Sequence, residues 1–312
     1  MKSRTGTLAG TLSVLVVFWV ATSTAYATNI TLNCSRGGSI SATLASLENS
    51  GDTRGVTIFV NGTCRENITI FQFDHLTLVA SPTATLQDAS SGSAPVVQIV
   101  SSYDARLIGF NIIGGSQGVN CTNDSFCSLV QNRIQQASGV GVRFGRSRGV
   151  LSNNNIMNNG DAGILGVNGS EILTGADTIS NNGGEGIDLD SGSNLTAQSD
   201  TITGNTTGIG ALSGSVIRAT DVTIRNNSGD GVYLEGNSTA QFDDGNMITG
   251  NGQVGVSIND LSFASFNFTG GTNNVSGNQR QPDVACYPQF SATRGADTVG
   301  GTTNCVEPEH KK

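Results

Sequence analysis

"TISNNGGEGIDLDSGS", residues 178–193, carries a pattern that returns along the chain and from which the fold can be predicted. It recurs as "TITGNTTGIGALSGS" at 201–215 and as "TIRNNSGDGVYLEGNS" at 223–238, with further copies before and after. Each unit holds a short apolar strand, a turn with Asn, a second apolar strand after Gly, and a small polar turn. Internal similarity at a period of about 20–50 residues is the signature of a solenoid or a related repeat array.

Two residue columns keep this period through the centre of the chain. They are Asn159, Asn182, Asn205, Asn227 and Asn251, and Gly163, Gly186, Gly208, Gly231 and Gly255. A unit of about 22 residues with such short strands cannot bury its own apolar face, so the units must stack in register. The Gly residues suit tight corners, and the Asn side chains suit a hydrogen-bonded ladder from coil to coil. The sequence therefore predicts an all-β parallel β-helix.

The two ends of the chain differ from the repeat. Residues 1–27 carry Lys2 and Arg4 before an apolar run and end in "AYA", which is typical of a secretory signal peptide. Residues 28–280 are predicted to form the β-helix domain together with an N-terminal cap. Residues 281–312 are predicted to form a disulfide-closed C-terminal cap and tail.

A short helix is predicted near the start of the β-helix domain. In "GGSISATLASLEN", residues 37–49, Ser39 suits the N-cap position. Ile40, Leu44 and Leu47 recur with helical spacing and would share one face. The helix would cover the open end of the first coil, whose strand edges would otherwise recruit other chains.

All six cysteines lie after residue 27, and an even number in a secreted chain favours disulfides over metal or redox chemistry. Six cysteines allow 15 pairings. Closeness in the sequence favours three local pairs, which are Cys34 with Cys64, Cys121 with Cys127, and Cys286 with Cys305. The chain is thus expected to be secreted or extracytoplasmic, in a periplasm or at a cell surface.

Composition argues against several classes of function. Outside the predicted signal peptide 14 basic residues face 24 acidic ones, which argues against nucleic acid as a partner. No later apolar run is long enough to span a bilayer, so no membrane insertion is expected after signal removal. With only His75 and His310, a multi-histidine zinc site or a Ser-His-Asp triad is not expected. The sequence predicts no cofactor and no metal, and no motif supports a Ca²⁺ site.

Three further stretches carry a resemblance to a known family. They are "VNGTCRENITI" at 60–70, "LTLVASPTATLQD" at 76–88 and "LIGFNIIGGSQGV" at 107–119. With the Asn and Gly coils that follow, they resemble the pectin lyase-like superfamily, including its carbohydrate-binding and sugar-hydrolase module. The resemblance covers roughly residues 29–278. It implies a right-handed parallel β-helix and a polysaccharide or cell-surface glycan as the partner.

Catalytic signatures of that superfamily are largely missing. Of the four polygalacturonase signatures, only the Asp-Asp pair has a counterpart, at Asp243 and Asp244. The Asp-Pro-His signature of mannuronan epimerases and the Trp-Ile-Asp-His stretch of pectate lyases are absent from the sequence. No active site of the family is therefore carried over to this chain.

The strands that follow the corner Gly residues predict two outward columns. The first column is Arg143, Leu165, Asp188, Gly210, Tyr233 and Ser257, and the second is Gly145, Val167, Asp190, Leu212, Glu235 and Asn259. Five of these residues are candidate substrate-binding residues, namely Arg143, Asp188, Asp190, Tyr233 and Glu235. Tyr233 offers a stacking surface, and Arg143, with Arg146 and Arg148, could hold a uronate carboxylate.

Asp188, Asp190 and Glu235 are also candidate catalytic acids. Asp190 and Glu235 lie two coils apart, with backbones about 10 Å apart on one face. Their carboxyl groups would then approach the roughly 6.5–9.5 Å separation of inverting glycosidases. The alternative is plain solvation, because outward positions of such a solenoid must be polar. Glu185 is expected to be a solvated corner residue.

Three other acids have a structural interpretation. Asp177, Asp200 and Asp221 each come just before a "TI" or "VTI" strand and are expected to be turn or ladder residues. For the whole chain the favoured interpretation is a polysaccharide-binding protein without established catalysis. One alternative is a glycoside hydrolase, uronate lyase or epimerase. The other is a structural or adhesive surface scaffold.

Overall fold

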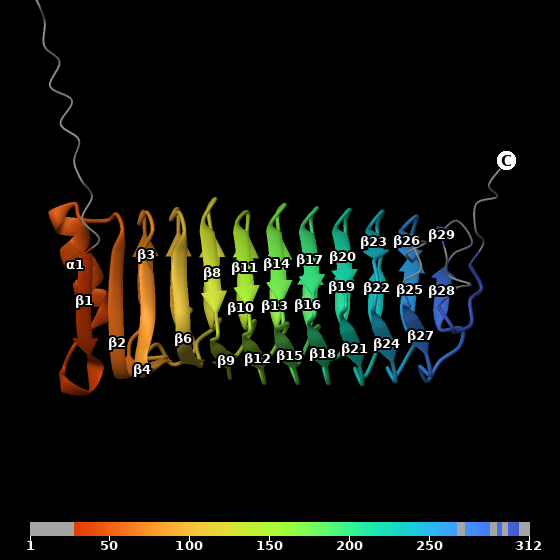
Figure 1. Cartoon of the computed structure of the whole chain (residues 1–312), viewed down its shortest axis with the longest axis horizontal. Coiled ribbons are helices and arrows are strands. Elements are labelled where there is room, and N and C mark those ends of the chain that lie inside the picture. Colours follow the sequence, from red (N-terminus) through yellow and green to blue (C-terminus); the bar gives the residue numbers. More distant parts are fainter. Residues whose placement is uncertain (1–27, 267–271, 288–291, 295–298, 306–312) are drawn as a thin grey trace, which may run out of the picture.

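The computed structural model describes residues 28–266, 272–287, 292–294 and 299–305, and its coils stack along one long axis (Figure 1). Apart from one α-helix and one 3-10 helix, the described chain consists of strands joined by turns. Each strand pairs in parallel with the equivalent strand of the next coil. The predicted parallel β-helix is therefore confirmed, while the predicted signal peptide lies outside the described residues.

One side of the solenoid is a ten-stranded sheet. Its strands are β3 (Ile68–Phe71), β5 (Val97–Val100), β7 (Val119–Thr122), β10 (Val142–Gly145), β13 (Ile164–Val167), β16 (Ile187–Leu189), β19 (Ile209–Ala211), β22 (Val232–Leu234), β25 (Val256–Asn259) and β28 (Val284–Tyr287). β28 pairs in register with β25, so this sheet continues for one strand beyond Asn278, where the sequence repeat ends.

The remaining sides belong to a 19-stranded sheet. It begins with the long strands β1 (Thr28–Asn33), β2 (Val56–Arg65), β4 (Thr77–Gln87) and β6 (Ala105–Ile113), and then divides into two series of short strands. The β8–β29 series comprises β8 (Phe126–Val130), β11 (Arg148–Ser152), β14 (Glu171–Gly175), β17 (Asn194–Gln198), β20 (Val216–Thr220), β23 (Thr239–Phe242), β26 (Phe263–Phe266) and β29 (Ala292–Arg294). The β9–β27 series comprises β9 (Arg133–Gln135), β12 (Asn155–Met157), β15 (Thr178–Ser180), β18 (Thr201–Thr203), β21 (Thr223–Arg225), β24 (Met247–Thr249) and β27 (Asn274–Ser276).

The predicted Asn ladder lies at the corner before the ten-stranded sheet. Nδ2 of Asn182 donates to Oδ1 of Asn205 at 3.0 Å, and Asn205 donates in the same way to Asn227 at 3.2 Å. The full ladder is Asn159, Asn182, Asn205, Asn227, Asn251 and Asn278, and it ends on Asp283. These amides are buried, and buried polar groups are costly to leave unpaired, so the ladder fixes the register of the coils.

A second ladder joins the two series of short strands. It consists of Asn132, Asn154, Asp177, Asp200, Asn246 and Asn273. Asp177 and Asp200 are therefore ladder residues, which is one of the two roles, turn or ladder, expected from the sequence. Asp221 stands in the turn one position earlier, with a φ of 55°, and Val222 occupies the ladder position of that coil.

The corner glycines are required by close packing between coils. All the Gly residues of the predicted column are described, and none of them has a positive φ. A Cβ on Gly163 would lie 2.7 Å from the carbonyl O of Gly186, and one on Gly186 would lie 2.6 Å from the carbonyl O of Gly208. The tight corner is thus a consequence of the neighbouring coil, and any larger residue would push that coil away.

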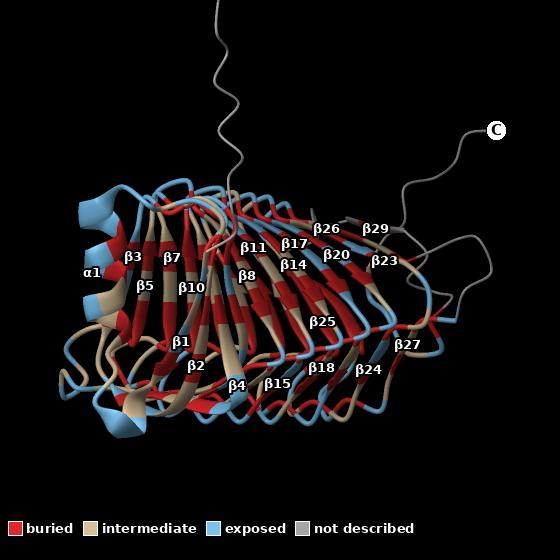
Figure 2. Ribbon diagram, turned by 60° about the vertical axis from the view of Figure 1, so that its left-hand side comes forward, coloured by how far each residue is buried: buried red, intermediate tan, exposed pale blue. Residues whose placement is uncertain are grey.

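The N-terminal end is closed by a helix, as predicted. α1 (Ile40–Ser50) begins after Ser39, whose Oγ accepts a hydrogen bond from the N–H of Ala42 at 3.1 Å. Ile40, Leu44 and Leu47 are buried, and Figure 2 shows the buried side of α1 turned toward the first strands. Within the described part of the chain, no helix has the length and apolarity needed to cross a membrane.

All three predicted disulfides are present. Cys34, in the 3-10 helix η1 (Cys34–Arg36), joins Cys64 of β2, and their Cα atoms are 5.1 Å apart. The other two bridges are Cys121–Cys127 and Cys286–Cys305. The first bridge fastens η1 to β2 at the N-terminal end, the second spans the corner between β7 and β8, and the third lies at the C-terminal end.

Candidate functional site

The ten-stranded sheet aligns the predicted outward residues in rows, and Ser257, the last of the first row, is buried rather than exposed to solvent. Paired residues of successive coils form the first row, Arg143, Leu165, Asp188, Gly210, Tyr233 and Ser257. In β16 the flanking residues Ile187 and Leu189 are fully buried, whereas Asp188 between them is partly exposed. The structure thus brings the five predicted binding residues to one face, over the strands from β10 to β22.

Gly210 leaves a notch between Asp188 and Tyr233. Its strand β19 lies between β16 and β22, and Gly210 brings no side chain to the row. A Cβ at this position would meet Cγ of Glu185 at 3.5 Å and Oδ1 of Asp188 at 3.6 Å. Glu185, expected at a solvated corner, therefore leans over the notch beside Asp188. The pattern within its own unit could not indicate this, because the space comes from the next coil.

The surroundings of Asp188 raise its pKa to about 6. Partial burial is the largest cause, and the like charges of Glu185, Asp190 and Asp161 add to it. A carboxyl group with this pKa exchanges its proton in mildly acidic solution. It is therefore able to donate or accept a hydrogen bond from a ligand, or to transfer a proton.

Tyr233 and Glu235 form a pair on the other side of the notch. The hydroxyl of Tyr233 donates to Oε2 of Glu235 at 2.9 Å. Burial is the main cause that raises the pKa of Tyr233 to about 12, and the bond to Glu235 adds to it. Asp190 has a separate partner, because its Oδ1 accepts from the N–H of Ser191 at 2.6 Å. The two carboxylates predicted as a catalytic pair are thus each engaged within their own coil.

Arg143 lies in a separate basic hollow of about 230 Å³. The hollow is lined by Thr122, Asn123, Arg143, Gly145, Arg146 and Asn168. Nη1 of Arg143 donates to Oδ1 of Asn120 at 3.3 Å, and the guanidinium lies over Gly145. Leu165 separates Arg143 from Asp188. The face therefore has a basic hollow and an acidic notch, roughly 10 Å apart.

Only two of the three predicted arginines come together. Arg146 lines the hollow beside Arg143. Arg148 lies beyond the corner, in β11 of the 19-stranded sheet, where it pairs with Glu171 at 3.5 Å. Its guanidinium also lies 5.5 Å from the centre of the Phe126 ring. Arg148 is therefore not available to a ligand held by Arg143.

A serine ladder supports the second outward row. Oγ of Ser193 donates to the carbonyl O of Asp190 at 2.8 Å, and Oγ of Ser238 donates to the carbonyl O of Glu235 at 2.7 Å. The backbone N–H of one serine donates to Oγ of the next, from Ser102 to Ser125 and, in a longer run, along Ser147, Ser170, Ser193, Ser215, Ser238 and Ser262. The sequence signal for this ladder is the Ser that ends each quoted repeat unit, at Ser193, Ser215 and Ser238, where the pattern alone predicts only a small polar turn.

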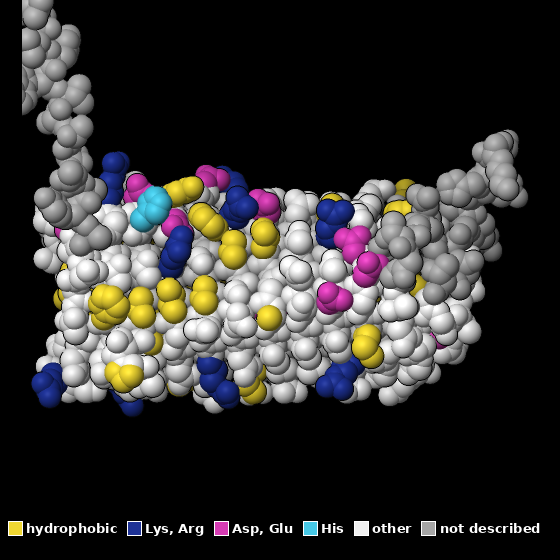
Figure 3. All heavy atoms as spheres, viewed as in Figure 1, with side chains coloured by type: hydrophobic (Ala, Val, Ile, Leu, Met, Phe, Trp, Pro, Cys, Tyr) yellow, Lys and Arg dark blue, Asp and Glu magenta, His cyan; other side chains and the backbone are white. Residues whose placement is uncertain are grey.

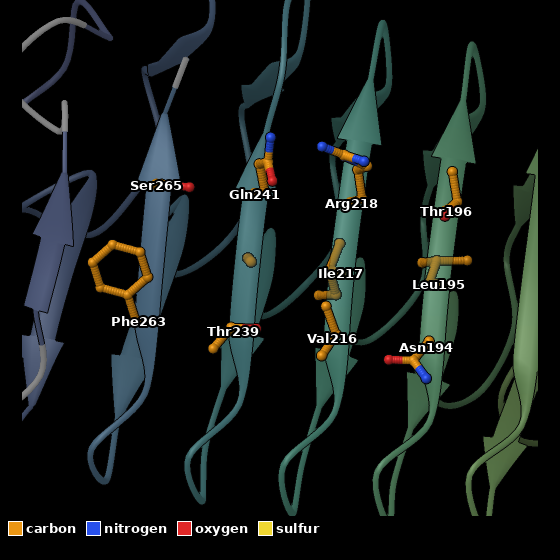
Figure 4. Close-up of a pocket in the computed structure, with 11 residues that line it drawn as sticks. Asn194, Leu195, Thr196, Val216, Ile217, Arg218, Thr239, Gln241, Phe263 and Ser265 are labelled. Atoms are coloured by element: carbon orange, nitrogen blue, oxygen red, sulfur yellow. The ribbon is translucent and has the colours of Figure 1, made fainter. Parts of the chain in front are cut away.

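A hollow of about 500 Å³ lies on the other sheet, over β17, β20, β23 and β26. Figure 4 shows Val216, Thr239 and Phe263 on successive strands, with Arg218 and Gln241 farther along β20 and β23. Sequence reasoning missed this surface, because it aligned only the strands that follow the corner Gly residues.

One group of metal-ligating atoms lies within 4.8 Å of one another among the described residues, at Cys34, Cys64 and Glu66. The two sulfur atoms form a disulfide. Glu66 accepts from Oγ of Ser39 at 2.8 Å and from the N–H of Ile40 at 2.7 Å, at the N-terminus of α1. These contacts give the group a structural role, and the expected lack of a metal or cofactor stays a prediction.

A family model described as a right handed beta helix region matches residues 117–279. A search among curated proteins gave no match. The handedness implied by the resemblance is thus confirmed.

Solved structures with similar folds include three enzymes. The A-module of mannuronan C-5 epimerase AlgE6 from Azotobacter vinelandii superposes with a TM-score of 0.64 at 14% identity, covering 89% of this chain and 97% of that one. The pectate lyase Pel9A gives a TM-score of 0.58 at 13% identity, covering 91% of this chain and 78% of that one. An alginate lyase from Paenibacillus sp. gives a TM-score of 0.51 at 15% identity, covering 85% of this chain and 99% of that one. At these identities the likeness shows the fold alone.

Proposed function

The chain belongs to the family of right-handed β-helix proteins, and we propose that it is a secreted protein that binds polysaccharide along its ten-stranded sheet without catalysis. One observation carries the proposal, namely the single face that bears Arg143, Asp188, Tyr233 and their neighbours in register. Equivalent positions repeat about every 4.8 Å along this face. A periodic surface suits a linear polymer, because each coil offers a contact to the next part of the ligand.

The chemistry of the face varies along its length. Arg143 in the basic hollow suits a sugar carboxylate or a pair of hydroxyl groups, whereas Arg146 beside it already pairs with Asp124 at 3.3 Å. Leu165 follows as an apolar ledge. The carboxyl groups at the Gly210 notch accept from sugar hydroxyls, and Asp188 also donates when it is protonated. A ligand that spans these parts would carry both hydroxyl and carboxyl groups.

Two further observations support the proposal. The relatives of similar fold are, by their names, enzymes of mannuronan, pectate and alginate, so polysaccharide as the ligand class rests on analogy of fold. The three disulfides suit an oxidising compartment, such as a periplasm or a cell surface.

The test is a binding measurement with a panel of polyuronates and neutral glycans. We expect Arg143→Ala to weaken polyuronate binding about tenfold, the size of a lost charge-assisted hydrogen bond. Arg133→Ala is the matched control, because Arg133 is an exposed arginine on β9, outside the proposed face. Unchanged binding in Arg143→Ala would contradict the proposed site. A panel without any binding would favour the structural or adhesive scaffold.

One observation favours an enzyme as the second candidate. Asp188 lies beside Glu185 and has a pKa raised to about 6, which suits a general acid or base. Incubation with the same panel, followed for new reducing ends and for absorbance of unsaturated products, tests this candidate. Activity that disappears in Asp188→Asn would support it, and activity that persists in that variant would place the reaction elsewhere.

A further inference from the structure

The 19-stranded sheet also carries a row of outward side chains, which runs along its β8–β29 series. In strand register it reads Phe126, Arg148, Glu171, Asn194, Val216, Thr239 and Phe263. Six coil steps separate its ends, or about 29 Å at the spacing of neighbouring strands. A hollow of about 370 Å³ lies at the start of the row, and the hollow of about 500 Å³ lies over its second half (Figure 4). The row is therefore a long, shallow track.

Aromatic rings mark both ends of this track, an exposed one at the start and a half-buried one at the far end. Tyr103 is 60% exposed, and its ring lies edge-on to Phe126 with centroids 5.9 Å apart. The His75 ring continues the cluster at 5.5 Å from Tyr103. Phe263 lines the hollow at the other end. The exposed ring of Tyr103 adds little to the core, and the accessible faces of Tyr103 and Phe263 suit the C–H face of a sugar ring.

The arginines of the track are all paired with acids. Arg146 pairs with Asp124 at 3.3 Å, Arg148 with Glu171 at 3.5 Å, and Arg218 with Asp243 at 3.3 Å. Figure 3 shows blue and magenta side chains interleaved along this edge of the molecule. The lining is therefore balanced in charge, in contrast to the basic hollow at Arg143. It attracts no polyanion, while its ion pairs still offer donors and acceptors to hydroxyl groups.

We propose that this track, from Tyr103 to Phe263, binds a neutral linear oligosaccharide. The inference goes beyond the function proposed for the ten-stranded sheet, since it concerns another face and another class of ligand. Because aromatic stacking and neutral hydrogen bonds dominate the contact, the affinity depends little on salt. Binding to the basic hollow, by contrast, weakens as salt screens the charges.

The experiment titrates the whole protein with soluble cello-, xylo- and manno-oligosaccharides, at low and high salt. Tyr103→Ala and Phe263→Ala remove the ring at each end and are expected to weaken binding about tenfold or more each. Phe71→Ala is the matched control, because Phe71 is an exposed ring on β3 of the ten-stranded sheet, at 43% exposure. Thermal melts of all variants verify that they fold.

Two results separate this inference from the proposed function. Loss of neutral-sugar binding in Tyr103→Ala and Phe263→Ala, with binding kept in Phe71→Ala and Arg143→Ala, supports the track. Neutral-sugar binding that is absent, that survives both ring removals, or that disappears only in Arg143→Ala overturns it. Polyuronate binding is measured in parallel on the same variants, so a failure of the ten-stranded sheet site is seen separately.

Discussion

At the scale of single residues, two carboxyl groups stand in a ladder where most rungs are amides. Asp177 and Asp200 are each 1% exposed. Oδ1 of Asp177 accepts from the N–H of Asn154 at 2.6 Å, and Oδ1 of Asp200 accepts from the N–H of Asp177 at 2.8 Å. Burial raises the pKa of both groups, that of Asp200 to about 6. Oδ2 of Asp200 accepts from Oγ1 of Thr174 at 2.5 Å, and Oδ2 of Asp177 accepts from the N–H of Gly175 at 3.2 Å. These bonds favour the ionised acids, and burial outweighs them.

The raised pKa makes stability depend on pH. The folded state binds more protons than the unfolded state between about pH 4, the ordinary pKa of Asp, and pH 6. The contribution of Asp200 to stability is therefore lost as the pH rises through this window. We expect Asp200→Asn to raise the free energy of unfolding by about 1–3 kcal/mol at pH 7, and by less toward pH 4.

Urea unfolding between pH 4 and pH 7 measures this effect. Asp221→Asn is the control, because Asp221 is an exposed turn residue one position before the ladder, and its variant should show no such gain. A loss of stability in Asp200→Asn at pH 7, or a gain that is the same at every pH, would contradict the assignment.

The Gly210 notch gives a second prediction at this scale. The charge of Glu185 helps to raise the pKa of Asp188, so Glu185→Gln should lower that pKa from about 6 toward the ordinary value. Carboxyl NMR titration of Asp188 in both proteins provides the measurement. Asp161→Asn serves as the comparison, because the charge of Asp161 is the smallest of the causes that raise the pKa of Asp188 and its removal should have the smaller effect. An equal pKa in Glu185→Gln and the unchanged protein would rule out the leaning geometry of Glu185.

At the scale of elements, the corners hold the coils in register. Each ladder rung uses its side chain for two coils at once, as Asn205 does by accepting from Asn182 at 3.0 Å and donating to Asn227 at 3.2 Å. Asn205→Ala would remove the acceptor of the Asn182 N–H, at 3.0 Å, and the side-chain donor to the carbonyl O of Ile179, at 3.1 Å. We expect a loss of about 2–4 kcal/mol in the free energy of unfolding, since each unpaired buried group costs roughly 1–3 kcal/mol.

Chemical denaturation of the variant provides the check. Gln198→Ala, an exposed position of β17, is the control and should change stability by less than about 0.5 kcal/mol. Equal stability of Asn205→Ala and the control would mean that the ladder does not carry the register.

The repeat in the sequence predicted the residues at the corner before the ten-stranded sheet, and it predicted those at the other corners only in part. Asn205 and its equivalents form a column that is visible in the sequence, and so do the Gly residues. The cause of the Gly column was less visible, because it lies in the carbonyl groups of the next coil. The arginines were separated for a similar reason. The sharp corner between β10 and β11 sends Arg143 and Arg148 to different faces, although five positions separate them in the sequence.

At the scale of the whole molecule, each coil contacts mainly its neighbours, so stability is a sum of local terms. The disulfide Cys34–Cys64 closes a 30-residue separation at the N-terminal end. Its removal in Cys34→Ala/Cys64→Ala should cost about 3–4 kcal/mol, by the loop-closure model.

The place along the solenoid where stability is lost, when the Cys34–Cys64 bridge is removed, is as informative as the size of the loss. Amide hydrogen exchange should become faster in β1 and β2 and stay unchanged in β16 and β19, because the bridge acts on the first coils. A uniform acceleration along the solenoid would contradict the picture of locally coupled coils.

The fold followed from the sequence because one pattern recurs through the central coils, and a departure from the pattern in one unit does not alter the period. The disulfide pairs followed in the same way, because coils that are close in the sequence are close in space. The binding face could be predicted only as a set of outward positions. Whether Asp188, Glu185 and Arg143 act on one ligand depends on side-chain directions, which the neighbouring coils determine.

The most direct test of the central claim is a footprint of bound polysaccharide by hydrogen exchange and NMR shifts, with a ligand that the binding panel identifies. We expect the changes to gather on the outward residues from β10 to β22, at Arg143, Asp188 and Tyr233. The absence of changes on this face, with the ligand bound at saturation, would contradict the claim that the ten-stranded sheet binds polysaccharide.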